Sequence, residues 1–146
     1  MKKIFSSPLT QSKKTWIITA ILSVPVFLLV YLAYKEPKVE FDSNAFKLKG
    51  LYGVNLSFSE IEKVDTIVWK EMPAISLRAN GISLNKVHRG KFITTSDDKI
   101  HLSVKRGINP IIRIRKQDGS LYYINRKTAN ETRQVFNQLK AKSIKQ

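Results

Sequence analysis

The sequence predicts a mainly β domain of roughly seven strands, curled into a partly open barrel, capped by a C-terminal α-helix and preceded by one N-terminal transmembrane helix. Three observations predict this fold class. The chain carries no charge from Thr15 to Tyr34. From Val39 onward, apolar and polar residues alternate in short runs separated by turn residues, which is typical of half-buried strands. Near the end, apolar residues recur every three or four positions and indicate an amphipathic helix.

The net charge of the chain favours anionic partners. Its 26 Lys and Arg residues against 11 Asp and Glu residues give a formal net charge of +15 in 146 residues. This charge suits phospholipid headgroups, nucleic acid or an acidic protein, although it also serves simply to keep a small domain in solution. No cysteine is present, so disulfides and cysteine ligands are excluded and the compartment is left open.

The uncharged stretch follows a basic N-terminal tail, residues 1–14. Thr15–Tyr34 has the about 20 residues that a helix needs to cross roughly 30 Å of hydrocarbon. Trp16 lies near one end and Tyr31 near the other, where aromatic rings favour the membrane interface. A cleaved signal peptide shares the basic start and apolar core, but it ends in small residues, whereas this stretch ends in bulky Tyr31 and Tyr34. We therefore predict an uncleaved, single-pass anchor in the cell membrane.

The orientation of this anchor is left undetermined by the flanking charges. The lysines on the two sides are equal in number, and the positive-inside rule then favours neither side. Those before the stretch are Lys2, Lys3, Lys13 and Lys14, and those soon after it are Lys35, Lys38, Lys47 and Lys49.

A short connector, residues 35–40, leads into the predicted domain, residues 41–142. Alternating or continuous apolar runs mark the strand candidates, and Asn, Asp, Gly and Ser residues mark the turns between them. The candidates in chain order are Val39/Phe41, Phe46/Leu48, Val54/Leu56/Phe58, Val64–Trp69, Ile75/Leu77, Phe92, Ile100/Leu102/Val104, Ile111/Ile112/Ile114 and Leu121–Ile124. Ser59 and Glu62 have the spacing of a capping box, but the next strand begins too soon for more than one helical turn.

The predicted helix begins at Thr128, where Thr128 and Glu131 have the spacing of a reciprocal capping box. Its apolar face includes Val135, Phe136 and Leu139. A single helix of this kind closes the open corner of a curled sheet, and we expect Phe136 to be buried against that sheet.

Three stretches resemble the small bacterial pleckstrin-homology (PH)-like domains that are found behind membrane anchors. The first is FKLKGLYGVNLSFSEIEKV, the second is LRANGISLNKVHRGKF, and the third is NPIIRIRKQDGSLYYIN followed by ETRQVFNQLK. The likeness covers about residues 41 to 141. It implies two near-orthogonal sheets capped by a C-terminal helix, and a membrane-proximal module without catalytic activity. Some similar anchored proteins resemble self-immunity proteins against a bacteriocin that the producing cell makes.

Phosphoinositide binding is not expected from this resemblance. Eukaryotic PH domains that bind inositol phosphates place a Lys-x(n)-Lys/Arg-x-Arg pattern across their first hairpin. Here Lys47 and Lys49 are followed by GLYGVNLSF, which contains no basic residue.

Catalytic chemistry is not predicted. His88 and His101 lack a second histidine or a carboxylate at metal-ligand spacing, and Asp97-Asp98 reads as a hairpin turn. The sequence contains none of the G-x-S-x-G, P-loop or G-x-G-x-x-G motifs. We expect no enzyme activity, no cofactor, no metal and no small-molecule substrate.

The basic residues are the better candidates for a functional surface. Arg113 and Arg115 are two apart on a predicted strand and so share one face, with Lys105 and Arg106 just before them. Lys86, Arg89 and Lys91 form a second basic edge. Such cations suit lipid phosphates, although a solvated outer strand face has the same composition. Nucleic-acid binding would also need exposed stacking aromatics and is not expected.

Asn80-Gly81 is the dipeptide of a tight hairpin turn, and Arg78 lies two residues before Asn80. These two side chains are candidates for a recognition turn, although Arg78 serves equally well to satisfy a neighbouring carbonyl or acid. The sequence therefore predicts a membrane-anchored binding or scaffolding module that contacts membrane lipid and an unidentified protein or peptide. The alternative is a bacteriocin self-immunity protein acting at the membrane.

Overall fold

The computed structural model describes residues 9–143 and is mainly β. The chain divides into two compact units, one that ends at Leu32 and one that begins at Ala33. The first unit belongs to the helix α1, Leu9–Tyr34, which begins before the predicted span. Residues 1–8 of the predicted tail, with Lys2 and Lys3, lie outside the described residues.

Helix α1 is long and apolar enough to cross a membrane, because Thr15–Tyr34 has a mean hydropathy of 2.4. Its large apolar side chains are exposed; Trp16 is 76% and Phe27 is 73% exposed. A core helix of a soluble protein would have covered these side chains. A signal sequence also has the length and composition that identify this helix as a possible membrane span.

The first sheet has three antiparallel strands, β1 Lys38–Phe41, β2 Ala45–Lys49 and β3 Val54–Ser57. Alternate residues point to one side, so that Phe46, Leu48, Val54 and Leu56 are buried. These are the residues whose alternation predicted strands here. The strands predicted between residues 39 and 56 are therefore confirmed.

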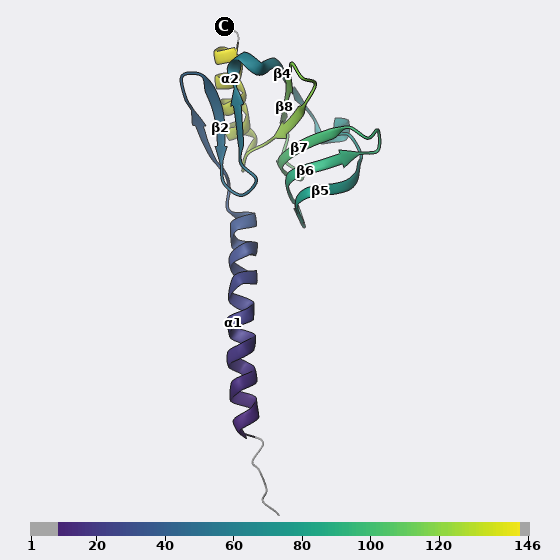
Figure 1. The fold of residues 1–146 in the computed structure, drawn as a ribbon. Helices are drawn as coiled ribbons and strands as arrows, with labels where there is room; N and C mark the ends of the chain where they lie inside the picture. Colours follow the sequence, from purple (N-terminus) through teal and green to yellow (C-terminus); the bar gives the residue numbers. More distant parts are fainter. Residues whose placement is uncertain (1–8, 144–146) are drawn as a thin grey trace, which may run out of the picture. The chain divides into compact units, whose positions relative to one another are not determined.

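The second sheet has six strands in the order β4-β8-β9-β7-β6-β5 (Figure 1). Strand β9 pairs parallel with β7, and the other neighbouring pairs are antiparallel. The strands are β4 Ile61–Ile67, β5 Ile75–Leu84, β6 Val87–Thr94, β7 Lys99–Lys105, β8 Ile111–Lys116 and β9 Leu121–Ile124.

The mainly β fold with a C-terminal helix is confirmed, but the finer description of the sheet is not. Residues 9–143 form nine strands, more than the roughly seven expected, and they lie in two sheets that do not close. The chain passes from β3 to β4 through a 3-10 turn, Phe58–Glu60, which breaks the hydrogen-bonded ladder between the sheets. This turn occupies the position of the predicted Ser59 capping box, and its N-cap, Ser57, makes no side-chain cap hydrogen bond.

Helix α2, Ala129–Ser143, packs against a core that both sheets share. Thr128 Oγ1 accepts a hydrogen bond from the Glu131 amide at 3.2 Å, which confirms the predicted N-cap. Leu139 is fully buried and Val135 is 8% exposed. Phe136 packs against this core as predicted but is only half-buried. The helix turns Val135 and Leu139, and not Phe136, most directly toward the sheets.

The predicted turn at Asn80-Gly81 is also wrong, because both residues lie inside β5. The hairpin turns instead at Asn85, whose φ is 47°. Gly81 pairs with Gly90 on β6, and a Cβ at Gly90 would lie 2.5 Å from the Gly81 Cα. Glycine is therefore required here for close approach of two strands, and this need accounts for a dipeptide that otherwise indicates a turn.

Candidate functional site

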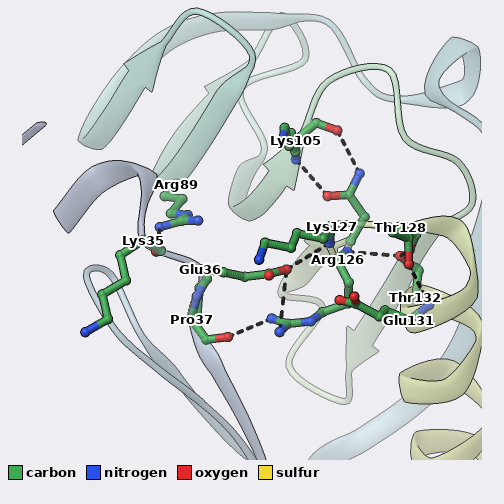
Figure 2. Close-up of polar contacts among 11 residues, drawn as sticks. Lys35, Glu36, Pro37, Arg89, Lys105, Arg126, Lys127, Thr128, Glu131 and Thr132 are labelled. Atoms are coloured by element: carbon green, nitrogen blue, oxygen red, sulfur yellow. Dashed lines mark hydrogen bonds and ion pairs between the residues drawn. The ribbon is translucent and has the colours of Figure 1, made fainter. Parts of the chain in front are cut away.

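The chain that leaves α1 is held against the β-rich domain by hydrogen bonds over Lys35–Pro37 (Figure 2). Arg89 Nη1 donates to the Lys35 carbonyl. Arg126 Nη1 donates to the Pro37 carbonyl at 2.7 Å, and its Nη2 lies 3.5 Å from Glu36 Oε1. The predicted connector is therefore a fixed segment of the domain and not a free tether.

Glu36 also accepts a hydrogen bond from the Lys127 amide at 2.8 Å. Lys127 and Arg126 lie between β9 and α2, where the Arg126 amide donates to Thr132 Oγ1 at 2.9 Å. The Thr132 hydroxyl in turn donates to the Thr128 carbonyl, and Thr132 is fully buried. The connector is thus hydrogen-bonded to the segment that begins helix α2.

Asn125 fixes the neighbouring corner of the domain. Its Oδ1 accepts from the Lys105 amide at 2.7 Å, and its Nδ2 donates to the carbonyls of Lys105 and Ile108 at 2.9 Å each. Every polar atom of this buried amide that faces the loop is satisfied. Lys105 is therefore held beside the connector even though its own side chain is exposed.

A cavity of about 70 Å³ lies beside this network. It has room for a few water molecules but is well below the roughly 300 Å³ at which small-molecule pockets begin. Its walls include four basic side chains and one carboxylate, Glu36. The lining residues are Tyr34, Glu36, Pro37, Val87, Arg89, Ser103, Val104, Lys105, Asn125, Arg126 and Lys127.

Arg89 does not have the role that the sequence suggested. The Arg89 side chain is buried, with 7% of the residue exposed, and it donates a hydrogen bond to the Lys35 carbonyl instead of binding an external anion. Burial lowers the pKa of Arg89, while Glu36 acts in the opposite direction. Its neighbour across the hairpin is Ser103 on β7, and the strand pairing turns the guanidinium inward toward the connector. Arg89 is a structural cation.

Arg113 is also engaged within the domain. Its Nε donates to Asp65 Oδ1 at 2.8 Å, and its Nη2 donates to Asp65 Oδ2. Arg115 is exposed and stands opposite Lys63 on β4. The two arginines share a strand face as predicted, but only Arg115 presents its charge to solvent.

The Asp65–Arg113 pair predicts an acid-dependent loss of stability. The guanidinium holds the pKa of Asp65 below its usual value, so the pair stabilises the folded state above the unfolded pKa of about 3.9 and loses this contribution as the pH falls through the folded pKa. We expect Asp65→Asn to lower the free energy of unfolding at neutral pH by an amount on the order of 1 kcal/mol. The gap should shrink as the pH falls from about 5 through the lowered pKa of Asp65. Urea midpoints measured across this range test it, and a gap that does not change with pH would contradict it.

The other predicted basic residues fall into two places. Lys86, Lys105 and Arg106 lie together beside the connector, because Val87 pairs with Lys105 and the Arg106 amide donates to the Lys86 carbonyl at 2.6 Å. Their side chains are exposed, as is that of Lys127. We call these four residues the connector-side basic patch. Lys91 lies further along β6, opposite His101.

The predicted pairing of Arg78 and Asn80 on one recognition surface is wrong. Arg78 stands opposite Phe92, and Asn80 stands opposite Lys91, with a register shift between them. Since Phe92 and Lys91 are successive residues of β6, their side chains point to opposite faces, and so do those of their partners. Ala79 is the extra residue of this bulge.

The two histidines are held by neighbours within the domain. His88 Nδ1 lies 2.9 Å from Ser83 Oγ, and the ring is near Trp69 and Phe92. Burial lowers the pKa of His88 and that of His101. Among residues 9–143 no three His, Asp or Glu side chains are grouped so as to hold a metal ion.

No pattern in the sequence predicted the connector network. Glu36 and Lys127 are separated by most of the chain, and neither stands in a recognisable motif. The connector has two acids, Glu36 and Glu40, beside two lysines, and nothing in this composition distinguishes Glu36. Comparisons with models of protein families, with curated proteins and with solved structures find no match for this chain.

Proposed function

We propose that this chain is a single-pass membrane protein whose β-rich domain is a non-catalytic binding module held against the anionic bilayer surface. The observation that carries the proposal is the fixed connector. An apolar helix is followed immediately by residues 35–37, which are hydrogen-bonded to the domain. A spanning helix would end at the headgroup level, and the part of the domain that binds these residues would lie there too.

The connector-side basic patch supports contact with anionic lipid. The Lys127 amide binds Glu36, and Lys105 lines the same small cavity as Glu36. The cations of the connector-side basic patch would therefore lie near the headgroups, within the screening length of about 8 Å at physiological salt. Each cation near an anionic leaflet contributes about 1 kcal/mol of attraction. Arg113, which is paired with Asp65, has no part in this surface.

The domain is proposed to be PH-like, in keeping with the sequence resemblance. Two packed sheets, the first antiparallel and the second mixed, and a C-terminal helix over their shared core support this assignment. The parallel β7–β9 pair and the open sheets are features that the simple seven-stranded expectation lacks. A scaffolding role without catalysis follows from the resemblance and from the chemistry of the connector, which is limited to hydrogen bonding and charge.

Single cysteines in this naturally cysteine-free chain test the placement. A fluorophore at Lys127→Cys should be quenched strongly by headgroup-spin-labelled lipid in nanodiscs. A matched label at Ser96→Cys, in the turn at the opposite end of β6 and β7, should be quenched less. Equal quenching at both positions would contradict the placement of the connector at the bilayer surface.

The charge dependence is tested with the same label. Quenching at position 127 should be stronger in phosphatidylglycerol than in phosphatidylcholine nanodiscs and should weaken between about 0.05 and 0.5 M salt. Lys105→Gln with Arg106→Gln should reduce the lipid-bound population ratio about tenfold to thirtyfold. Lys63→Gln with Arg115→Gln, a matched loss of two exposed cations elsewhere, should leave it nearly unchanged. A preference for anionic lipid that persists in the first variant would oppose the proposal.

A second candidate is binding of a protein partner, which includes the bacteriocin-immunity hypothesis. Two cavities of about 460 and 470 Å³ share Val68 and Asn109, and Val68 is 44% exposed. Phe136 of α2 lines the first, and Trp69 lines the second. The second cavity has mainly apolar walls and the first has mixed walls, a combination that favours a peptide or protein over a headgroup. A gene position beside a bacteriocin precursor and exporter would favour the immunity form of this candidate.

A further inference from the structure

A separate cavity of about 360 Å³ lies on the six-stranded sheet. This volume is within the range of about 300–1,000 Å³ that is typical of small-molecule sites. Four strands contribute to its walls: β5, β6, β7 and β9. The lining residues are Ala79, Lys91, Lys99, Ile100, His101, Ser120, Leu121 and Tyr122.

Strand register gathers the polar residues of this cavity on one face. Lys91 of β6 stands opposite His101 of β7, and His101 stands opposite Tyr122 of β9. Directly paired residues point to the same side of a sheet, so these three form a row across three strands. Lys99 precedes His101 by two residues on β7, which places it on the same side, and Ser120 lines the cavity from the turn before β9.

The cavity has excess positive charge. Lys91 and Lys99 are exposed, and within the described part of the chain neither ammonium group lies within 4.0 Å of a carboxylate. The eight lining residues include no Asp or Glu. Of the acids in the two adjacent turns, Asp118 binds the Ser120 amide at 2.8 Å and lies 3.3 Å from Lys116, and Asp97 and Asp98 directly precede Lys99. Two lysine side chains therefore line a cavity whose lining holds no carboxylate, while the Ser120 hydroxyl is hydrogen-bonded to Asp118.

His101 and Tyr122 form an aromatic wall. Their rings are stacked, with centroids 5.4 Å apart and planes 23° apart. His101 Nε2 lies 3.3 Å from the Tyr52 carbonyl, which only accepts, so this nitrogen donates and carries the proton. Burial and then the nearby Lys91 lower the pKa of His101, while the Tyr52 contact raises it. The lowered pKa favours the neutral ring, in which Nδ1 carries no proton when Nε2 donates.

We propose that this cavity is a binding site for the phosphate group of a ligand, held by Lys91 and Lys99 against the His101–Tyr122 wall. Lysine suits phosphate because its ammonium group is a compact charge with three donors. The free phosphate ion and the headgroup phosphate of a lipid share this chemistry. None of these residues belongs to the connector-side basic patch, so the two proposals stand or fall separately.

The two histidines of the chain allow a direct test in the full-length protein. The chain is labelled with ¹³C at histidine Cε1 and placed in phosphatidylcholine nanodiscs, so that only His88 and His101 give signals. Inorganic phosphate is added at constant ionic strength. We expect a saturable shift of the His101 signal and no saturable shift of the His88 signal. The pKa of His101 should rise on binding, because the anion favours the charged ring over the repulsion from Lys91 and Lys99.

A pair of double variants distinguishes a site from general charge. Lys91→Gln with Lys99→Gln should weaken phosphate binding by about tenfold or more. Lys86→Gln with Lys105→Gln removes the same charge from the connector-side basic patch and should leave phosphate binding within about twofold. The histidine signals in phosphate-free buffer show whether both variants are folded. They should match those of the wild type, apart from a small local shift of His101 when its neighbour Lys91 is replaced.

The source of the phosphate is distinguished by a second arm. Phosphatidylglycerol nanodiscs without added phosphate should shift His101 if the group belongs to a lipid, and should leave it unshifted if the ligand is soluble. Equal shifts of both histidines with phosphate, or a His101 shift that survives Lys91→Gln with Lys99→Gln, would overturn the proposal. Failure of the connector-side quenching experiment would leave this result untouched.

Discussion

Replacing Leu139 by alanine is expected to lower the free energy of unfolding of the β-rich domain by about 2–5 kcal/mol. Leu139 is fully buried between α2 and both sheets, where it belongs to one cluster with Phe46, Leu56 and Ile114. Removing most of its side chain leaves a cavity that rigid strands fill only partly. A small domain has only about 5–15 kcal/mol of stability, so this change should bring it close to unfolding.

Urea unfolding of the full chain in mild detergent measures this effect. The chain has two tryptophans, so a Trp16→Phe background leaves Trp69 as the sole reporter of the domain. Gln138→Ala is the matched control, because Gln138 is the neighbouring residue and is exposed. It should shift the free energy of unfolding by less than about 0.5 kcal/mol. Equal midpoints for Leu139→Ala and Gln138→Ala would show that α2 does not cover the shared core.

Replacing Leu28 by lysine is expected to impair membrane insertion by about 3 kcal/mol, which corresponds to roughly a hundredfold change in the insertion equilibrium. Leu28 lies in the inner part of the apolar stretch and is 55% exposed, so no side chain of the helix shelters a charge there. The wild-type chain should remain in the membrane fraction after carbonate extraction, and the variant should be depleted from it. Leu28→Ile preserves the apolar volume and is expected to behave as wild type.

The same fractionation tests the anchor against a signal peptide. An anchor leaves a full-length chain in the membrane, whereas cleavage releases a shorter soluble form. Recovery of a mature soluble chain that begins near residue 34 would refute the anchor. Retention of Leu28→Lys to the same extent as wild type would show that Thr15–Tyr34 does not span the bilayer.

The elements were predictable where local chemistry determines them. Thr128 is an N-cap because its hydroxyl accepts an amide hydrogen bond only three residues on, a feature that spacing alone reveals. Phe46 and Leu48 are buried because alternation places both on one face of β2. The turn predicted at Gly81 was wrong because this glycine is needed for a close approach to Gly90. That approach exists only once β5 and β6 pair, so the local sequence does not reveal it.

The candidate sites were much less predictable. Arg89 and Arg113 were expected at an external surface, but each has a partner within the domain, Lys35 or Asp65. The sequence shows how many cations there are. It does not show which of them are bound by a carbonyl or carboxylate that is distant along the chain. Lys91, His101 and Tyr122 likewise form one row only through the parallel β7–β9 pairing, which the expectation of a simple antiparallel barrel did not include.

The position of β9 also constrains the order in which the protein is completed during synthesis. Strand β9 lies between β8 and β7, so it joins the pair β4–β8 to the meander β5–β6–β7. These two parts share no ladder until residues 121–124 have been made, well after α1 has emerged. Until then β7 and β8 each present an open edge that is prone to pairing with another chain. If α1 enters the bilayer first, the unfinished sheet is tethered beside the membrane, where translation and insertion keep it apart from other nascent chains.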